Sequence, residues 1–334
     1  MARLVLQRLA LLIPTLLGLS ILLFLWVRAL PGGPATALLG ERATPEAVAN
    51  INRLYGFDKP LLEQYLTWLG QLVTGNFGVS TRTGVPVLEE FLGRFPATIE
   101  LTVVALVIAV GVGIPLGYLA ARHQGRALDH TTVVASLLGV TIPVFFLAFL
   151  LKYAFAVELG WFPSAGRQDP TIVATHPTGF YVLDGLLTRE WDASWDALKH
   201  LFLPALALGS IPLAIIARIT RASVIEVQGA DYVRTARAKG LRPPRLRRRV
   251  VLRNAMLPVA TTIGLQVGLL LSGAVLTETV FAFNGIGSFL AEAIFSLDYA
   301  VLQGFILFVA VVYALANLAV DVSYGLIDPR MRVR

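Results

Sequence analysis

Long apolar stretches recur along the chain, and polar segments separate each of them from the next. A helix that crosses a bilayer needs roughly 20 mostly apolar residues. Six stretches come close to that length or exceed it, and they cover residues 9–27, 99–121, 131–157, 201–217, 256–276 and 301–327. The pattern predicts an all-α fold, that of a polytopic membrane protein with six transmembrane helices.

These spans predict a division of the chain into three parts. Residues 1–30 form an N-terminal transmembrane helix, residues 31–97 an extracytoplasmic segment, and residues 98–334 a transmembrane core that contains a cytoplasmic loop at 222–254. Prolines inside the spans, such as Pro143, are expected to be tolerated, because neighbouring helices satisfy the freed backbone groups.

The distribution of positive charge orients the helices. Cytoplasmic loops of membrane proteins carry an excess of Lys and Arg. With the N-terminus in the cytoplasm, the segments on that side hold about two thirds of the 28 basic residues. We therefore expect a multi-pass protein of the inner or plasma membrane with both termini in the cytoplasm. A cleaved signal peptide is the alternative for the first span, but its apolar run is longer than usual for such a peptide.

Composition supports a membrane protein and limits its chemistry. Hydrophobic residues make up 56% of the chain and charged residues 15%, against about 25% charged in soluble domains. There is no cysteine, phosphate loop, H-E-x-x-H or G-x-S-x-G motif, and the four histidines lack metal-ligand spacing. We expect no catalytic residue, metal or bound cofactor, no ATP hydrolysis by this chain alone, and lipid rather than nucleic acid around it.

The cytoplasmic loop contains a short predicted helix. Asp231 is a good N-cap, Gly240 a good C-terminal stop, and Pro243 prevents continuation. Within this helix Tyr232, Ala236 and Gly240 follow one another at i+4 and share one face. That face, with an aromatic side chain followed by two small residues, fits a groove on another protein. A charged loop that only sets the topology is the alternative, and composition does not decide between them.

The same segment resembles the EAA loop of ABC importer permeases, by which the membrane subunit docks on its ATPase. Ala236 and Gly240 match this motif, whereas Arg234 and Thr235 stand where it has glutamate and alanine. The resemblance implies a set of ATPase-docking residues: Asp231, Tyr232, Arg234, Thr235, Ala236, Arg237, Ala238, Lys239, Gly240 and Leu241.

Further motifs extend the resemblance along most of the chain. They are typical of the dipeptide/oligopeptide/nickel branch and of the B-type of its two paired permeases: Leu30-Pro31-Gly32-Gly33-Pro34, Leu54-Tyr55-Gly56-Phe57-Asp58-Lys59-Pro60, Gly75-Asn76-Phe77-Gly78, Arg94-Phe95-Pro96-Ala97-Thr98 and Glu278-Thr279-Val280-Phe281. The resemblance implies a type I importer permease fold. It also implies as partners a second permease in a heterodimer, two ATPase subunits that bind ATP-Mg, and an extracytoplasmic binding protein.

Two features of the fifth span are candidates for a role in transport. Glu278 is either a pathway or gate residue or an acid wetted by lipid headgroups, since an acid deep in a bilayer costs about 2.5–3.5 kcal/mol. Gly264, Gly268 and Ser272 form a stripe of small residues that permits close helix packing, either within this subunit or against a paired permease.

The resemblance thus implies a permease subunit of an ATP-driven importer that forms half of the pathway for di- or oligopeptides. Nickel chelates or oligosaccharides as cargo are alternatives within the same branch. A secondary transporter or channel without an ATPase is a further alternative, and the docking helix disfavours it. A membrane-embedded enzyme comes third, since the motif search finds no catalytic constellation.

Overall fold

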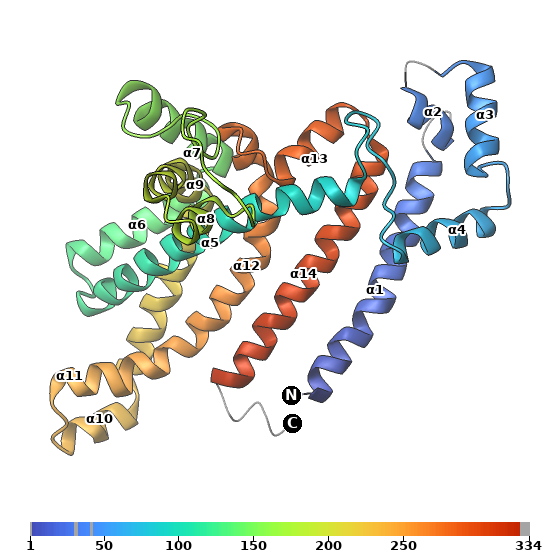
Figure 1. Cartoon of the computed structure of the whole chain (residues 1–334). Coiled ribbons are helices and arrows are strands. Elements are labelled where there is room, and N and C mark those ends of the chain that lie inside the picture. The colour runs from blue at the N-terminus through green and yellow to red at the C-terminus, as the bar shows by residue number, and fades with distance from the viewer. Residues whose placement is uncertain (1, 30–32, 41–42, 328–334) are drawn as a thin grey trace. The chain divides into compact units, whose positions relative to one another are not determined.

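The structure is a computed structural model that describes residues 2–29, 33–40 and 43–327. Within these ranges the chain is helical, and its only pairing of extended residues is an isolated bridge between Val79 and Pro86. Figure 1 shows the helices in chain order. Their bounds are α1 Ala2–Arg28, α2 Gly33–Leu39, α3 Pro45–Tyr55, α4 Leu61–Val73, α5 Val87–Arg122, α6 Ala127–Thr141, α7 Val144–Leu151, the π-helix η2 Lys152–Glu158, α8 Tyr181–Leu187, α9 Trp191–Gly229, α10 Asp231–Ala238, α11 Pro243–Arg245, the π-helix η3 Leu246–Leu252, α12 Arg253–Phe281, α13 Ile286–Phe295 and α14 Tyr299–Ile327.

The described residues hold 5 helices that are long and apolar enough to cross a membrane, or up to 7 spans if each of two bent helix pairs counts as one. Five of the six predicted spans correspond to α1, α5, α9, α12 and α14. The all-α membrane fold predicted from the sequence is confirmed.

The predicted third span, residues 131–157, is not one straight helix. It consists of α6 and a second segment from Val144 to Glu158, and the two are bent by 105°. Pro143 lies at the break and Ile142 before it is extended, with φ −74° and ψ 123°. A proline lacks the amide hydrogen and disfavours a helical conformation of the preceding residue. The expectation that Pro143 would be tolerated inside a helix was wrong.

The segment predicted as extracytoplasmic, residues 31–97, is largely helical. It contains α2, α3 and α4, and its last residues already belong to α5, which begins at Val87. Helix α3 has regular ends: the hydroxyl of Thr44 accepts a hydrogen bond from the Ala47 amide at 3.3 Å, and Gly56 ends the helix in the left-handed conformation with φ 67°.

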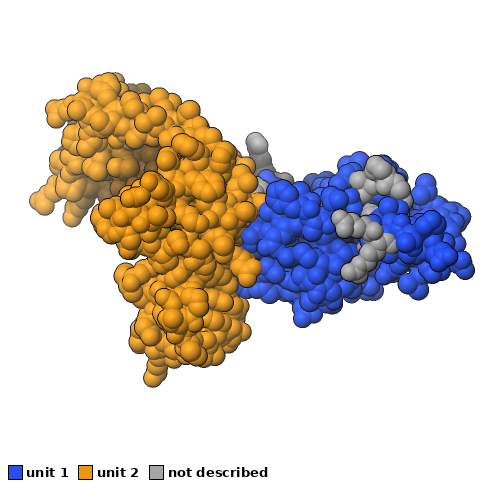
Figure 2. Space-filling view, turned by 90° about the horizontal axis from the view of Figure 1, so that it is seen from above, with its two compact units in different colours: residues 1–96, 285–334 blue, residues 97–284 orange. Residues whose placement is uncertain are grey.

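The chain forms two compact units, coloured in Figure 2. Unit 1 comprises residues 1–96 and 285–334, and unit 2 comprises residues 97–284. The first boundary between the units, after residue 96, lies within α5. The last transmembrane helix, α14, groups with unit 1 rather than with the other helices of the predicted core.

Unit 1 is held together by α1, α14 and a cluster of large apolar side chains. The side-chain amide of Gln303 on α14 donates to the Leu23 carbonyl on α1 at 3.0 Å. Phe91 of α5 packs edge-on against Phe289 of α13 and Phe305 of α14. Burial of such side chains is the main stabilising contribution where water is displaced.

Unit 2 is built around α9, which packs against α6, α7, α8 and α12. Glycines allow its closest approach to α5. A Cβ atom on Gly117 of α5 would lie 2.3 Å from the Ala217 carbonyl oxygen of α9, and one on Gly209 of α9 would lie 2.8 Å from the Ala105 carbonyl oxygen of α5. Small residues let membrane helices approach this closely.

Candidate functional site

Helix α10 stands with α11 at one end of unit 2, next to the adjoining ends of α9 and α12 (Figure 1). It runs over Asp231–Ala238, close to the predicted bounds. Asp231 is not the N-cap. Ala230 occupies that position with an extended backbone, φ −69° and ψ 146°, and no side chain caps the helix. The Asp231 carboxylate instead lies 3.7 Å from the Arg234 guanidinium, one turn along.

A single buried residue fixes α10 to the long helices. Val233 is buried in an apolar cluster with Val224 of α9, Leu246 and Val251 of η3, and Ala255 of α12. The cluster therefore ties α10 to both helices that lead into the membrane part of unit 2.

The predicted face of Tyr232, Ala236 and Gly240 is divided in the structure. Tyr232 is 48% exposed and Gly240 is exposed. Ala236 is half-buried and packs against the cluster around Val233. The other predicted docking residues are all exposed: Asp231, Tyr232, Arg234, Thr235, Arg237, Ala238, Lys239, Gly240 and Leu241.

Gly240, the predicted C-terminal stop of this helix, has a conformational role in the structure. Its φ is +78°, in the left-handed region, and a Cβ atom there would meet no atom within 4 Å. A substitution at Gly240 therefore strains the backbone even though space is available. An effect of Gly240→Leu would report this strain as well as any docking contact, so Tyr232 is the cleaner probe.

Glu278 lies in the last turn of α12 and is fully buried, with 0% of its surface exposed. Its carboxylate accepts a hydrogen bond from the Thr98 hydroxyl of α5 at 2.6 Å. Within the described chain this acid therefore joins α5 to α12 and lies away from solvent. A buried acid is costly unless hydrogen bonds compensate, and this contact provides one.

The structure describes two of the three small residues of the stripe on α12. Gly264 and Gly268 are buried, and α12 packs against α9. The side chain of Ser272 lies outside the described residues. Close helix contacts are also made at Gly117 and Gly209. The spacing of Gly113 and Gly117 on α5, four residues apart, was a usable signal for this contact.

Sequence reasoning also missed a buried ion pair at the end of unit 2 that carries α10. The Arg221 guanidinium of α9 donates to both carboxylate oxygens of Asp129 on α6, at 2.5 and 2.9 Å. The Gly125 amide adds a third hydrogen bond at 3.0 Å. Asp129 is buried, and such paired, bidentate contacts are among the stronger polar interactions in proteins. An acid at the start of an apolar helix was the available signal.

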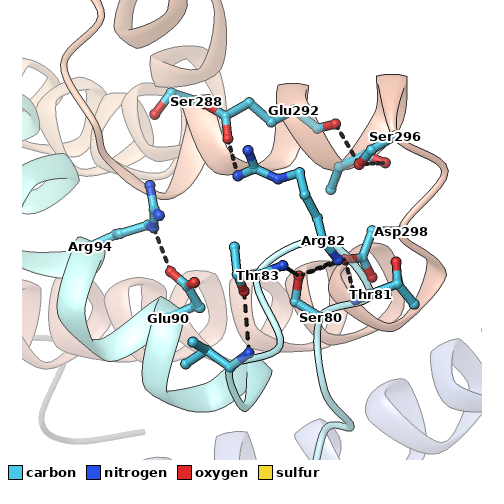
Figure 3. A network of polar contacts seen from close by, with 12 residues as sticks. Ser80, Thr81, Arg82, Thr83, Glu90, Arg94, Ser288, Glu292, Ser296 and Asp298 are labelled. Atoms are coloured by element: carbon cyan, nitrogen blue, oxygen red, sulfur yellow. Dashed lines mark hydrogen bonds and ion pairs between the residues drawn. The ribbon is translucent and has the colours of Figure 1, made fainter.

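A second polar network lies in unit 1 and is drawn in Figure 3. Asp298, just before α14, is buried and accepts hydrogen bonds from the Ser80 hydroxyl at 2.7 Å and the Thr81 amide at 2.8 Å. Beside it, Arg82 forms an ion pair with Glu292 of α13. These contacts hold the loop before α5 against the α13–α14 turn, across more than 200 residues of sequence.

The apolar spans define a membrane-embedded protein, and α10 carries an exposed surface outside those spans. The fold is similar to that of a chain of the MetNI methionine ABC transporter in an inward-facing conformation, with a TM-score of 0.53, 17% identity, and coverage of 71% of this chain and 96% of that one.

The chain belongs to the family of binding-protein-dependent transport system inner membrane components. The model of that family matches residues 113–333, and the model of the family's N-terminal part matches residues 1–102. The chain is 47% identical to the di/tripeptide transport system permease protein DppB of Pseudomonas aeruginosa, over 98% of this chain and 97% of that one. It is 45% identical to the dipeptide transport system permease protein DppB of Escherichia coli, over 99% of both.

Proposed function

We propose that this chain is the permease subunit of an ATP-driven importer and forms half of the pathway for di- or oligopeptides. The near-complete coverage of relatives named as dipeptide permeases supports the peptide cargo. Nickel chelates and oligosaccharides remain the alternative cargo. The proposed assembly adds a second permease, two ATPase subunits that carry ATP-Mg, and an external binding protein.

The observation that carries the coupling mechanism is the position of α10. Its outer surface is exposed, while Val233 on its inner side packs against α9, η3 and α12. In the proposed mechanism the ATPase binds the exposed surface of α10. Movement of the ATPases on ATP binding then shifts α10, and the cluster passes this shift to α9 and α12. The chain itself contributes no catalytic residue.

The proposed orientation places α10 and both termini in the cytoplasm, as the excess of Lys and Arg on that side favours. The chain contains no cysteine, so Arg245→Cys gives a single labelling site. Arg245 is exposed in α11. An impermeant maleimide should label it in inverted vesicles and leave it unlabelled in intact cells. Labelling in intact cells would contradict the orientation.

Transport is tested with cells that lack this chain. Uptake of a labelled dipeptide should fall to background in these cells and return when the chain is restored. The same uptake assay with a labelled nickel chelate shows whether this alternative cargo depends on the chain. Unchanged dipeptide uptake in cells from which only this chain is missing, with no second dipeptide importer present, would refute peptide import by this subunit.

A further inference from the structure

A polar cavity of about 320 Å³ lies in unit 2, at the end of α9 remote from α10. The loop between η2 and α8 forms most of its wall, and Ala282 and Asn284 in the turn after α12 line the rest. Under the proposed orientation this end of α9 is extracytoplasmic. The cavity therefore lies on the side from which cargo arrives.

Three side chains in this wall have buried polar atoms without a partner. Among the described residues, six buried side-chain nitrogen or oxygen atoms lack a hydrogen bond. Three of them are threonine hydroxyls in long helices. The other three are Arg167 Nε, Gln168 Nε2 and His176 Nδ1, and all three residues line this one cavity. Buried polar groups are nearly always satisfied, so such a concentration indicates an absent partner.

The three residues are held in place by contacts that leave these atoms open. The Arg167 guanidinium donates to Glu100 at 3.0 Å and to the Gly179 carbonyl at 2.7 Å, and it stacks 3.7 Å from the Tyr181 ring centroid. His176 stacks on the same ring at 3.6 Å. Its Nε2 lies 2.9 Å from the side-chain oxygen of Gln168. The site is therefore ordered without a ligand, which lowers the entropic cost of binding one.

The hydrogen-bond roles of the open atoms follow from these contacts. An amide oxygen only accepts, so this contact assigns the donor role to His176 Nε2, and in that tautomer Nδ1 is the acceptor. Arg167 Nε and Gln168 Nε2 are donors. The ligand must therefore offer an acceptor oxygen and an N–H donor close together.

A peptide bond offers both groups on opposite sides, since its carbonyl oxygen accepts and its amide nitrogen donates. A lone carboxylate ligand fits less well, because the cavity wall also contains the carboxylate of Asp169. The amide and hydroxyl of Thr171 both donate to Asp169, and they hold its pKa below the usual value. The negative charge of Asp169 repels an anion and suits an N–H or ammonium donor.

We propose that this cavity is a subsite for the backbone amide of the transported peptide, with Gln168 donating to its carbonyl oxygen and His176 accepting from its N–H. The subsite rests on the proposed function as a peptide permease. It gives the permease its own recognition of the peptide bond, separate from that of the binding protein.

The test uses the whole assembly in proteoliposomes with its binding protein outside and ATP inside. The two probes are alanyl-glycine and alanyl-sarcosine, which is alanyl-glycine with a methyl group in place of the amide hydrogen. Gln168→Glu keeps an oxygen for His176 and removes the open donor. His176→Phe keeps a ring to stack on Tyr181 and removes the open acceptor. Val173→Ala is the control, since Val173 is 96% exposed on the same loop.

Each variant should raise the KM for alanyl-glycine about 3- to 10-fold, the effect of one lost hydrogen bond. His176→Phe should also reduce the wild-type preference for alanyl-glycine over alanyl-sarcosine by a similar factor, which a purely structural role would not do. Val173→Ala should leave KM and preference unchanged. Co-purification of the assembly at wild-type yield checks folding.

Wild-type KM and wild-type preference in both variants would overturn the subsite. A wild-type assembly that moves neither dipeptide would instead contradict peptide transport itself, before any variant is compared.

Discussion

The contact between α5 and α9 at Gly117 yields a prediction with a magnitude. A Cβ atom on Gly117 would lie 2.3 Å from the Ala217 carbonyl oxygen and 2.8 Å from Thr220 Cβ. Carbon and carbonyl oxygen atoms in close contact are about 3.3 Å apart. Gly117→Ala must therefore push the two helices apart by roughly 1 Å, and backbone atoms cannot move aside as a flexible side chain could.

Overpacking of this kind costs about 1–3 kcal/mol. At about 2–4 °C per kcal/mol, the melting temperature should fall by roughly 2–12 °C. The assay is thermal unfolding of the purified chain in detergent or of the whole assembly, followed by loss of the monodisperse peak in size-exclusion chromatography.

Gly111→Ala is the matched control for this substitution. Gly111 lies on the same helix, and a Cβ atom there meets nothing within 4 Å. The control should melt at the wild-type temperature or slightly above it, because alanine favours a helix over glycine. If both variants melt together, the close approach of α5 and α9 at Gly117 is wrong.

Three further predictions concern the other contacts. Glu278→Leu removes the acceptor of the Thr98 hydroxyl and should destabilise the chain by about 1–3 kcal/mol in thermal unfolding. Glu278→Gln keeps an oxygen there and should cost clearly less. Equal losses of stability in the two variants would show that this hydrogen bond is unimportant. Asp129→Asn should cost about 1.5–3 kcal/mol through its weakened contact with Arg221, and a double-mutant cycle with Arg221→Gln that shows no coupling would contradict the pair. Tyr232→Ala should reach the membrane at normal levels yet weaken ATPase association about tenfold in a pull-down. Arg245→Ala, beyond Pro244, should change ATPase association only slightly. ATPase association unaffected by Tyr232→Ala would remove Tyr232 from the docking surface.

The membrane spans were predictable because each depends on local composition. An apolar run of sufficient length must satisfy its own backbone in lipid, and a helix does so without reference to the rest of the chain. The helix at 231–238 was likewise marked by Gly240 and the prolines that follow it. The bend at Pro143 could not be separated from a tolerated proline, since the outcome depends on whether neighbouring helices satisfy the freed carbonyls.

The contacts that order the candidate sites could not be predicted from local sequence patterns. Asp298 and Ser80 are 218 residues apart, and Glu278 and Thr98 are 180 apart. Their pairing depends on how helices pack, which local patterns do not encode. The half-burial of Ala236 has the same origin, because i+4 spacing shows which residues share a face but not which part of that face a neighbour covers.

Transport driven by ATP is the central claim, and one measurement tests it most directly. The assembly is reconstituted in proteoliposomes with ATP inside, and the binding protein and a labelled dipeptide outside. The account predicts accumulation of the dipeptide above its external concentration, only when ATP and both ATPase subunits are present. Movement of the dipeptide through this chain without ATPase subunits, or ATP hydrolysis by the complete assembly without accumulation, would contradict it.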